Sequence, residues 1–367
     1  MASRKKKNTE EHPLDDGLQK MFGEITKQYG EGSIMRLGSR GHIETPHIPT
    51  GSISLDIDLG IGGFPRGRIV EVYGPESSGK TTLSLSVISH AQKAGGVCAI
   101  VDVEHALDAR WAETIGVDVD ELFISQPDCG EDALGITEAL VASNRIAVVV
   151  VDSVAALVPR AEIEGQMGDS HIGLQARLMS QAMRKLNGIV SKSNTCLIFT
   201  NQIREKIGVM FGSPETTSGG NALKFYASIR MRISKSDKIA ETGKEDPIGN
   251  VVKYKILKNK MAPPFRDGTF DILYDSGISY EYSLIDAGLE LGVLEKRGSW
   301  IAWGSEQLGQ GKVQCAQALK DDKERAAKLD GEIRIKSDLV KIDAEPKVNV
   351  TPPVDPVEGG VSADVSP

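Results

Sequence analysis

Cysteines are few in this sequence and lie far apart. The four of them, Cys98, Cys129, Cys196 and Cys315, form no C-x-x-C pair, so neither a disulfide framework nor a zinc site is indicated. Cys98 and Cys196 lie inside apolar runs, as small core residues of a reducing compartment do. We therefore expect a cytoplasmic protein.

Long apolar runs and excess positive charge are also lacking. No run approaches the roughly 18–20 apolar residues that span a bilayer, so we expect no membrane partner. The basic N-terminus (MASRKKK) is not followed by the apolar stretch of a secretory signal peptide. The net charge is -8 and the pI is near 5.4. Proteins that hold nucleic acid through bulk charge are normally basic, so any such contact here must be local.

What the chain does contain is a regular alternation of strand-like and helix-like segments between about residues 41 and 280. With 367 residues it can bury a full α/β core and carry a further small domain. Four near-continuous apolar strands are predicted, which is typical of a mostly parallel sheet with helices on both faces. They are Arg68–Tyr73, Val97–Asp102, Ala147–Asp152 and Thr195–Thr200. We also expect a helix from Thr81 to about Ala94.

The flanking segments differ from this core. Residues 1–12 are polar and read as disordered, and residues 13–36 carry an apolar stripe at helical spacing. That helix could pack on its own core or on a neighbouring subunit, and the pattern favours neither. Beyond residue 280 we expect a small α+β module, with helices over 283–294 and 311–329 and a short strand at Trp300–Trp303. The tail from Ser337 reads as disordered.

One motif identifies a phosphate-binding loop. Residues Gly74–Thr81 (GPESSGKT) fit the pattern G-x-x-x-x-G-K-[ST], with the required strand before it and helix after it. Its glycines allow backbone N–H groups to surround a β-phosphate, and the following helix directs its positive end at the anion. Lys80 supplies a cation for the β- and γ-phosphates, and the Thr81 hydroxyl is suited to ligate Mg²⁺. We therefore predict ATP and Mg²⁺ as ligands.

Polar residues at the ends of other strands supply the remaining chemistry. Asp152 ends the most apolar strand, where a carboxylate can hold the Mg²⁺ water shell. Glu104 follows a strand end and could activate the attacking water, with Glu76 and Asp102 as competitors. Gln202 ends the fourth strand, where its amide could sense the γ-phosphate or be an ordinary loop residue.

Two lysines stand two residues apart in a strand-like segment. Lys258 and Lys260 end the run Val252–Lys260, just before two prolines. Residues at this spacing share one face of a strand and could project together toward an anion. The alternative is an edge strand whose lysines prevent pairing with other chains.

Five motifs resemble the RecA family of bacterial recombinases. They are GPESSGKT (Gly74–Thr81), VDVEHALD (Val101–Asp108), VDSVAAL (Val151–Leu157), TNQIR (Thr200–Arg204) and TSGGNALKFY (Thr217–Tyr226). The run Gly208–Thr217 adds to the similarity, which is uninterrupted from about residue 14 to about 335. The resemblance implies an ATPase core at 42–280, a polymerisation segment at 1–41, a small domain at 281–336 and a tail at 337–367.

The same resemblance implies a DNA-dependent ATPase that forms filaments on single-stranded DNA. It would pair and exchange homologous strands with duplex DNA, and its filament would stimulate self-cleavage of a damage-response repressor. Glu104 would activate water, Gln202 would couple the γ-phosphate to DNA binding, and Lys258 and Lys260 would reach the neighbouring subunit's ATP. The nucleotide would be held by Gly74, Pro75, Glu76, Ser77, Ser78, Gly79, Lys80, Thr81, Thr82, Asp108, Trp111 and Tyr274, with Trp111 where the family usually has tyrosine.

For DNA, the resemblance implies two loops, at about 164–172 and 203–217. Contacts to DNA would come from Ile172, Arg177, Arg184, Arg204, Ile207, Gly219, Gly220 and Asn221, and Phe225 would lie at the subunit interface. Arginines and backbone N–H groups suit phosphate contacts, which carry no sequence code. Lys296, Arg297 and Lys312 of the small domain would face incoming duplex.

Three rival functions share parts of these motifs. A ring-shaped helicase or RecA-like clock or repair ATPase would lack the N-terminal helix and the 203–217 segment. A small-molecule kinase would need an arginine-bearing lid, which the sequence does not suggest. A non-hydrolysing polymer would not need Lys80, Glu104 and Asp152 together.

Overall fold

The computed structural model describes residues 15–31, 33–34, 45–205, 215–240, 246–337 and 339. The chain divides into two compact units, residues 1–44 and 45–367. In the first, the predicted helix is present as α1 (Asp16–Tyr29), which buries none of its residues and ends at Gly30 with φ of 90°. The predicted disordered segments, residues 1–12 and the tail after Ser337, lie outside the described residues, apart from Leu339.

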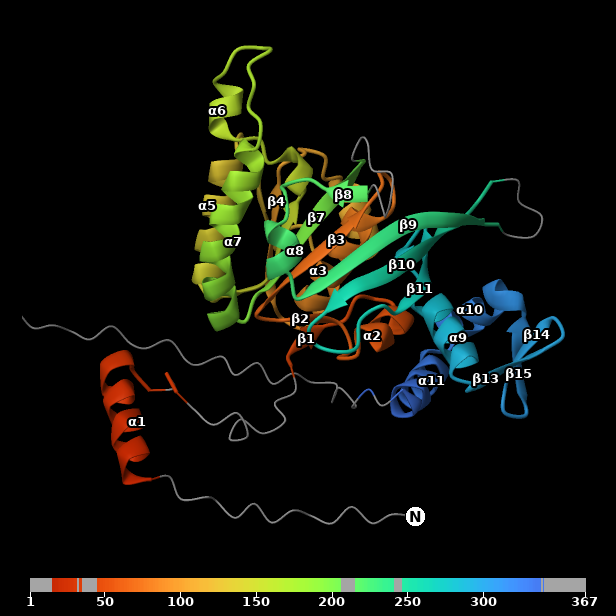
Figure 1. The fold of residues 1–367 in the computed structure, drawn as a ribbon. Helices are drawn as coiled ribbons and strands as arrows, with labels where there is room; N and C mark the ends of the chain where they lie inside the picture. The colour runs from red at the N-terminus through yellow and green to blue at the C-terminus, as the bar shows by residue number, and fades with distance from the viewer. Residues whose placement is uncertain are drawn as a thin grey trace, which may run out of the picture. The chain divides into compact units, whose positions relative to one another are not determined.

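The centre of the second unit is a sheet that contains all four predicted strands. They are β3 (Arg68–Gly74), β4 (Val97–Asp102), β6 (Ile146–Asp152) and β7 (Cys196–Glu205). They pair in parallel in the order β3-β7-β6-β4, and β5 (Leu122–Ser125) extends the sheet beyond β4. The predicted mostly parallel α/β core is therefore confirmed (Figure 1).

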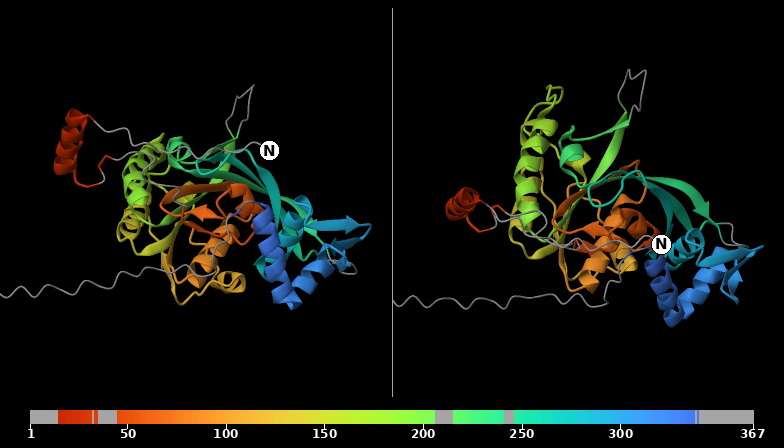
Figure 2. Two further views of the ribbon diagram at one scale, coloured as in Figure 1. Left: turned by 90° about the horizontal axis from the view of Figure 1, so that it is seen from below. Right: turned by 60° about the horizontal axis from the view of Figure 1, so that its bottom comes forward.

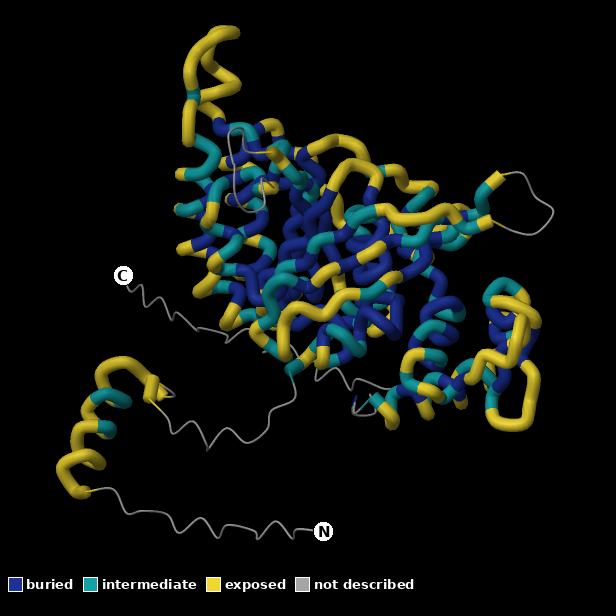
Figure 3. Tube along the Cα trace, turned by 45° about the vertical axis from the view of Figure 1, so that its right-hand side comes forward, coloured by how far each residue is buried: buried dark blue, intermediate teal, exposed yellow. Residues whose placement is uncertain are grey.

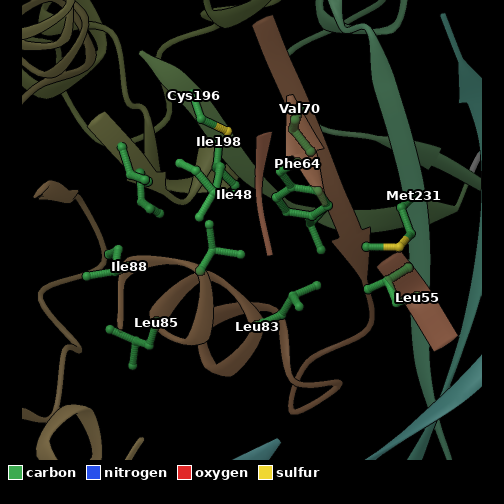
Figure 4. Close-up of a cluster of buried hydrophobic side chains, with 14 of the residues drawn as sticks. Ile48, Leu55, Phe64, Val70, Leu83, Leu85, Ile88, Cys196, Ile198 and Met231 are labelled. Carbon is green, nitrogen blue, oxygen red and sulfur yellow. The ribbon is translucent and has the colours of Figure 1, made fainter. Parts of the chain in front are cut away.

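Alternate residues of each strand enter two different cores, because side chains of a strand point to opposite faces. Val148 and Val150 pack with α3 (Lys80–Lys93), whereas Val149 and Val151 pack with α5 (Gly130–Ala142) and α7 (Leu174–Lys192). The turned views show α3 and α7 on opposite sides of the sheet (Figure 2). Side chains of α3, β3 and β7 belong to one buried cluster, in which Phe64 and Ile48 also lie (Figure 4). The middle residues of the central strands are buried (Figure 3).

A second, antiparallel block extends the sheet on the other side of β3. Here β9 (Ile229–Ile239) runs parallel to β3, and β10 (Gly249–Asn259), β11 (Asp267–Leu273) and β12 (Gly277–Ile278) follow in antiparallel order. β10 has a partner on each side from Gly249 to Lys255, whereas at Lys258 it pairs only with β9. The outer part of β9 and β10 forms an arm (Figure 3), in which residues 235–238 of β9 are exposed and Gly249 of β10 is buried.

The last third of the chain has its own small core. Helices α9 (Tyr280–Glu290), α10 (Gly311–Asp321) and α11 (Lys323–Lys336) pack beside the antiparallel sheet β13-β14-β15 (Leu294–Arg297, Trp300–Trp303, Glu306–Gln310). The strand predicted at Trp300–Trp303 is present. The single helix predicted over 311–329 is wrong, because the helix is interrupted at Asp322, between α10 and α11. The Asp322 carboxylate caps α11 by accepting a hydrogen bond from Arg325 N.

Short elements complete the unit. They are β1 (His47–Ile48), α2 (Ile53–Leu59), β2 (Phe64–Pro65), α4 (Ala109–Ile115), the 3-10 helix η2 (Val154–Ala156), α6 (Arg160–Ile163), β8 (Glu215–Thr217) and α8 (Ala222–Tyr226). None of the helices in the described ranges is both long and apolar enough to cross a bilayer.

Candidate active site

In the loop between β3 and α3, side chains donate hydrogen bonds to the loop's own carbonyl groups. Gly79 adopts φ of 92°, and the helix starts at the next residue. The Lys80 ammonium donates to the carbonyl oxygens of Pro75 at 2.7 Å and Gly74 at 3.3 Å, and Ser78 Oγ also donates to Pro75. Burial lowers the pKa of Lys80, an effect that the carboxylates of Asp152, Glu104 and Glu76 oppose. The loop thus keeps a partly buried cation at the start of a helix.

A cavity of about 310 Å³ opens over this loop at the carboxyl ends of the parallel strands. Strands β6, β7, β9, β10 and β11 contribute to it, together with the phosphate loop, α3, α4 and the turns after β4 and β11. Its lining comprises Glu76, Ser77, Ser78, Gly79, Lys80, Thr81, Thr82, Glu104, Trp111, Asp152, Gln202, Lys235, Asn250, Val252, Ile272 and Tyr274. Gly74 and Pro75 do not line it and contribute instead the two carbonyl groups that hold Lys80.

Two oxygen ligands meet at the floor of the cavity. Thr81 Oγ1 donates to Asp152 Oδ2 at 2.7 Å, and Thr200 Oγ1 donates to Asp152 Oδ1 at 2.5 Å. Burial raises the pKa of Asp152, while the two hydroxyl donors lower it. A hydroxyl and a carboxylate fit Mg²⁺, a hard cation that takes oxygen ligands and usually needs only one or two carboxylates beside phosphates and water.

Of the three candidate water activators, the geometry separates Glu104 from Asp102. Both oxygens of Asp102 are engaged, one by Ala106 N and the other by Leu107 N and Gln126 Nε2, so this carboxylate holds the turn after β4. Glu104 is exposed and lines the cavity. Its Oε1 accepts hydrogen bonds from Ser153 Oγ and, at 3.0 Å, from Gln202 Nε2.

That last hydrogen bond joins two residues that sequence reasoning treated separately. Glu104 follows β4 and Gln202 lies on β7, with β6 between the two strands. Glu76 also lines the cavity, from the loop itself. The cavity therefore presents the ammonium groups of Lys80 and Lys235, the carboxylates of Glu76 and Glu104 and the amides of Gln202 and Asn250 around the Thr81–Asp152 pair.

Of the three residues expected around adenine, the two aromatic ones line the cavity and Asp108 does not. Trp111 of α4 and Tyr274 of the turn after β11 both line the cavity, and Trp111 Nε1 donates to Thr82 Oγ1 at 3.2 Å. Asp108 is not part of the lining. Its carboxylate caps α4 by accepting from the N–H groups of Arg110 and Trp111, at 2.9 and 3.4 Å.

Sequence reasoning missed Lys235 and Asn250. They lie on β9 and β10 and reach the cavity because the antiparallel block is joined to β3. Asn250 Oδ1 is buried and, within the described part of the chain, has no hydrogen-bond partner. An acceptor buried beside a cavity suits a donor group on a ligand. No motif marks either residue, so only the pairing of the strands could have found them.

Lys258 does not line this cavity. It lies on β10 six residues beyond Val252, which does, a separation along the strand of roughly 20 Å at about 3.3 Å per residue. Its ammonium donates to the carbonyl oxygens of Lys224 at 2.8 Å and Phe225 at 2.7 Å. Burial lowers the pKa of Lys258, and the neighbouring Lys260 and Arg230 lower it further. Lys260 follows the end of the strand.

The two predicted DNA loops are described to different extents. Residues 164–172 follow α6 and end at Ile172, which is 90% accessible. Only the base of the 203–217 loop is described, where β7 and β8 pair antiparallel from Ile203↔Thr217 to Glu205↔Glu215. Ile207 lies outside the described residues.

The other candidate DNA and interface residues fall into two groups. Exposed side chains are Arg177, Arg184, Arg204, Asn221 and Phe225. Gly219 and Gly220 instead lie against the protein with φ of 79° and 76°. A Cβ on Gly219 would come within 2.8 Å of Val154 Cγ1, so only glycine fits there.

Lys312 does not face outward as expected. Its ammonium pairs with Asp271 of β11 and, at 2.6 Å, with Asp286 of α9, and it lies 5.0 Å from the Tyr282 ring centroid. It therefore ties the small C-terminal core to the central sheet, and the expectation that it presents its charge to duplex DNA is wrong. Lys296 and Arg297 remain exposed on β13.

Comparison with known proteins gives matches along nearly the whole chain. The RecA N-terminal domain model matches residues 16–279, and the RecA C-terminal domain model matches residues 282–338. The chain is 56% identical over 343 residues to the protein RecA of Leptospira meyeri, covering 93% of this chain and 87% of that protein. It is 54% identical over 349 residues to the protein RecA of Clavibacter michiganensis subsp. michiganensis, covering 95% of each.

Proposed function

This chain belongs to the RecA family, and from that premise we infer that it is a DNA-dependent ATPase that acts as a recombinase in DNA repair. We propose that it works as a helical filament on single-stranded DNA. The filament pairs this strand with homologous duplex DNA, exchanges strands and stimulates self-cleavage of a damage-response repressor. A cytoplasmic location completes the proposal.

Members of the RecA family use a nucleotide and Mg²⁺ in their ATPase activity. We place ATP in the cavity above the loop, with its phosphates against residues 74–82 and its base between Trp111 and Tyr274. Thr81 and Asp152 would hold Mg²⁺, which when bound neutralises charge on the β- and γ-phosphates. Asp108 supports the base site indirectly, by capping the helix that carries Trp111.

Glu104 is the residue that we assign to water activation. It accepts a proton as water attacks the γ-phosphorus and ADP departs, so the products are ADP and phosphate. Lys80 places positive charge where the phosphate oxygens gain negative charge. The hydrogen bond between Gln202 and Glu104 is the single observation that carries the coupling. Gln202 lies on the strand that leads into the 203–217 loop, so in this proposal a change at the γ-phosphate is transmitted through Gln202 to the start of that loop.

Lys258 and Lys260 act on the neighbouring subunit's ATP in this proposal. Lys258 does not line the cavity, and its ammonium donates instead to the carbonyl oxygens of Lys224 and Phe225. Phe225, 73% exposed, lies beside Lys258, because its carbonyl oxygen accepts from the lysine. We therefore assign both residues to one subunit interface, with α1 docking on the next subunit.

In this proposal the DNA phosphates are contacted by Arg177, Arg184, Arg204, Gly219, Gly220 and Asn221. Ile207, with Ile172 in support, inserts between base steps. The acidic net charge agrees with this assignment only if local basic groups do the binding, since most of the surface repels phosphate.

Electron microscopy of the purified chain with single-stranded DNA and a non-hydrolysable ATP analogue tests this function. We expect helical filaments that need both ligands. Closed rings would support the helicase-like rival, and dispersed monomers under all conditions would refute the proposal.

A further inference from the structure

The peptide bond between Ser218 and Gly219 is held from both sides by side-chain amides. Asn201 Nδ2 donates to the Ser218 carbonyl oxygen at 3.1 Å, and the Gly219 N–H donates to Gln175 Oε1 at 3.2 Å. Asn201 directly precedes Gln202 on β7, and Gln175 is in the first turn of α7, which follows the loop at 164–172. One peptide plane therefore connects the nucleotide site with the roots of both predicted DNA loops.

The orientation of the Gln175 amide is fixed by its surroundings. Its Nε2 donates to the carbonyl oxygens of Val154 at 2.9 Å and Leu157 at 3.2 Å, and a third carbonyl, of Ala155, lies at 3.5 Å. Since carbonyl groups can only accept, the nitrogen must face them and the oxygen must face Gly219. Gln175 is thus attached to the segment that follows Asp152 and Ser153.

The opposite side of the peptide is more firmly anchored. Asn201 Nδ2 also donates to Glu71 Oε1 at 3.1 Å, and Glu71, which is 0% exposed, forms an ion pair with Arg230. Removing one partner of such a buried network is costly, so the Ser218 carbonyl side stays in place. The Gly219 N–H side depends on one neutral hydrogen bond and is the side that can be released.

Gly219 is also packed too closely to turn its N–H elsewhere. It is buried, and the space around its Cα is filled by Val154 and Met179. A backbone N–H is a single donor, so it serves one good acceptor at a time. If this N–H binds a DNA phosphate, as the proposed function states, the Gln175 oxygen must first leave it.

We propose that Gln175 is a positioning residue that masks the Gly219 N–H in the DNA-free subunit, and that a DNA phosphate binds by displacing its amide oxygen. The inference rests on the proposed function and adds a residue to it. A charge-assisted hydrogen bond to phosphate is roughly twice as strong as a neutral one, so the exchange is favourable once DNA arrives. Because Gln175 is hydrogen-bonded to the residues that follow Asp152, its position is linked to the nucleotide site.

The test is the affinity of the Gln175→Ala variant for a fluorescent oligothymidylate, measured by anisotropy with and without a non-hydrolysable ATP analogue. Without nucleotide, the variant should bind roughly two- to tenfold more tightly than the wild type, the worth of one neutral hydrogen bond. With the analogue, the two proteins should differ less. The salt dependence of binding should not change, because the substitution adds no cation.

Two further variants keep the result interpretable. Gln175→Glu retains an acceptor for Gly219 but cannot donate to the three carbonyls and adds a negative charge beside the phosphate path, so it should weaken binding in both nucleotide states. Gln181→Ala, an exposed glutamine on the same helix, should behave as the wild type.

The inference is overturned if Gln175→Ala binds no more tightly than the wild type without nucleotide, or if Gln175→Glu binds as tightly as Gln175→Ala. A wild-type chain that ignores the oligonucleotide even with the analogue would instead refute the proposed function.

Discussion

If the site is shared between subunits, two inactive variants should restore each other. Glu104→Gln keeps the size of the side chain but removes the water activator, and Lys258→Ala removes the residue assigned to the neighbour's ATP. Each alone should lose turnover while still binding ATP. Every site in a mixed filament takes Glu104 from one subunit and Lys258 from the next, as a head-to-tail interface requires.

The expected recovery follows from this geometry. A site works only where a Lys258→Ala subunit supplies Glu104 and a Glu104→Gln subunit supplies Lys258. At equal mixing this combination occurs at about one quarter of the interfaces, so the rate should reach about a quarter of the wild-type value. Lys258 does not line the cavity of its own subunit, and its ammonium donates to the carbonyl oxygens of Lys224 and Phe225.

The assay is phosphate release on single-stranded DNA at constant total protein and varied mixing ratio. The rate should rise and fall as the product of the two fractions. As a control, Lys255→Ala, an exposed lysine on the same strand, should lose activity in simple proportion to the added Glu104→Gln. No recovery at any ratio would refute the shared site.

Two other predictions concern single side chains. Trp111→Phe keeps a stacking ring but loses the 3.2 Å hydrogen bond to Thr82, so ATP should bind roughly two- to tenfold more weakly by calorimetry. Unchanged affinity would separate Trp111 from the nucleotide. Burial raises the pKa of Asp56 to about 7 from its ordinary 3.8, so the folded state holds this proton more tightly than the unfolded state. Its contribution to the free energy of unfolding should therefore fall as pH rises from 3.8 toward 7. In urea unfolding, the free energy of unfolding of Asp56→Asn minus that of the wild type should be larger at pH 8 than at pH 5. Equal differences at both pH values would contradict the raised pKa.

The parts of this fold that could be predicted from sequence are those with local signals. The parallel strands are continuous apolar runs because both of their faces are covered, and the phosphate loop has a fixed spacing between a strand and a helix. β9 was not predicted, because it alternates apolar residues with Arg230, Arg232 and other polar ones and loses its apolar residues along the exposed arm.

The parts that could not be predicted depend on which strands become neighbours. Asn250 and Lys235 reach the cavity only because β9 pairs with β3 and β10 with β9. The role of Gln175 depends on three separate segments that meet at one peptide bond. Asp108 was assigned to the base on resemblance, whereas its described contacts are with the backbone of α4.

The central claim is that ATP hydrolysis at the loop of residues 74–81 is controlled by single-stranded DNA. Its most direct test is the steady-state rate of phosphate release by the wild-type chain with and without oligothymidylate, at saturating ATP and Mg²⁺. We expect negligible turnover without DNA and strong stimulation with it. A rate that is the same in both conditions would contradict the account.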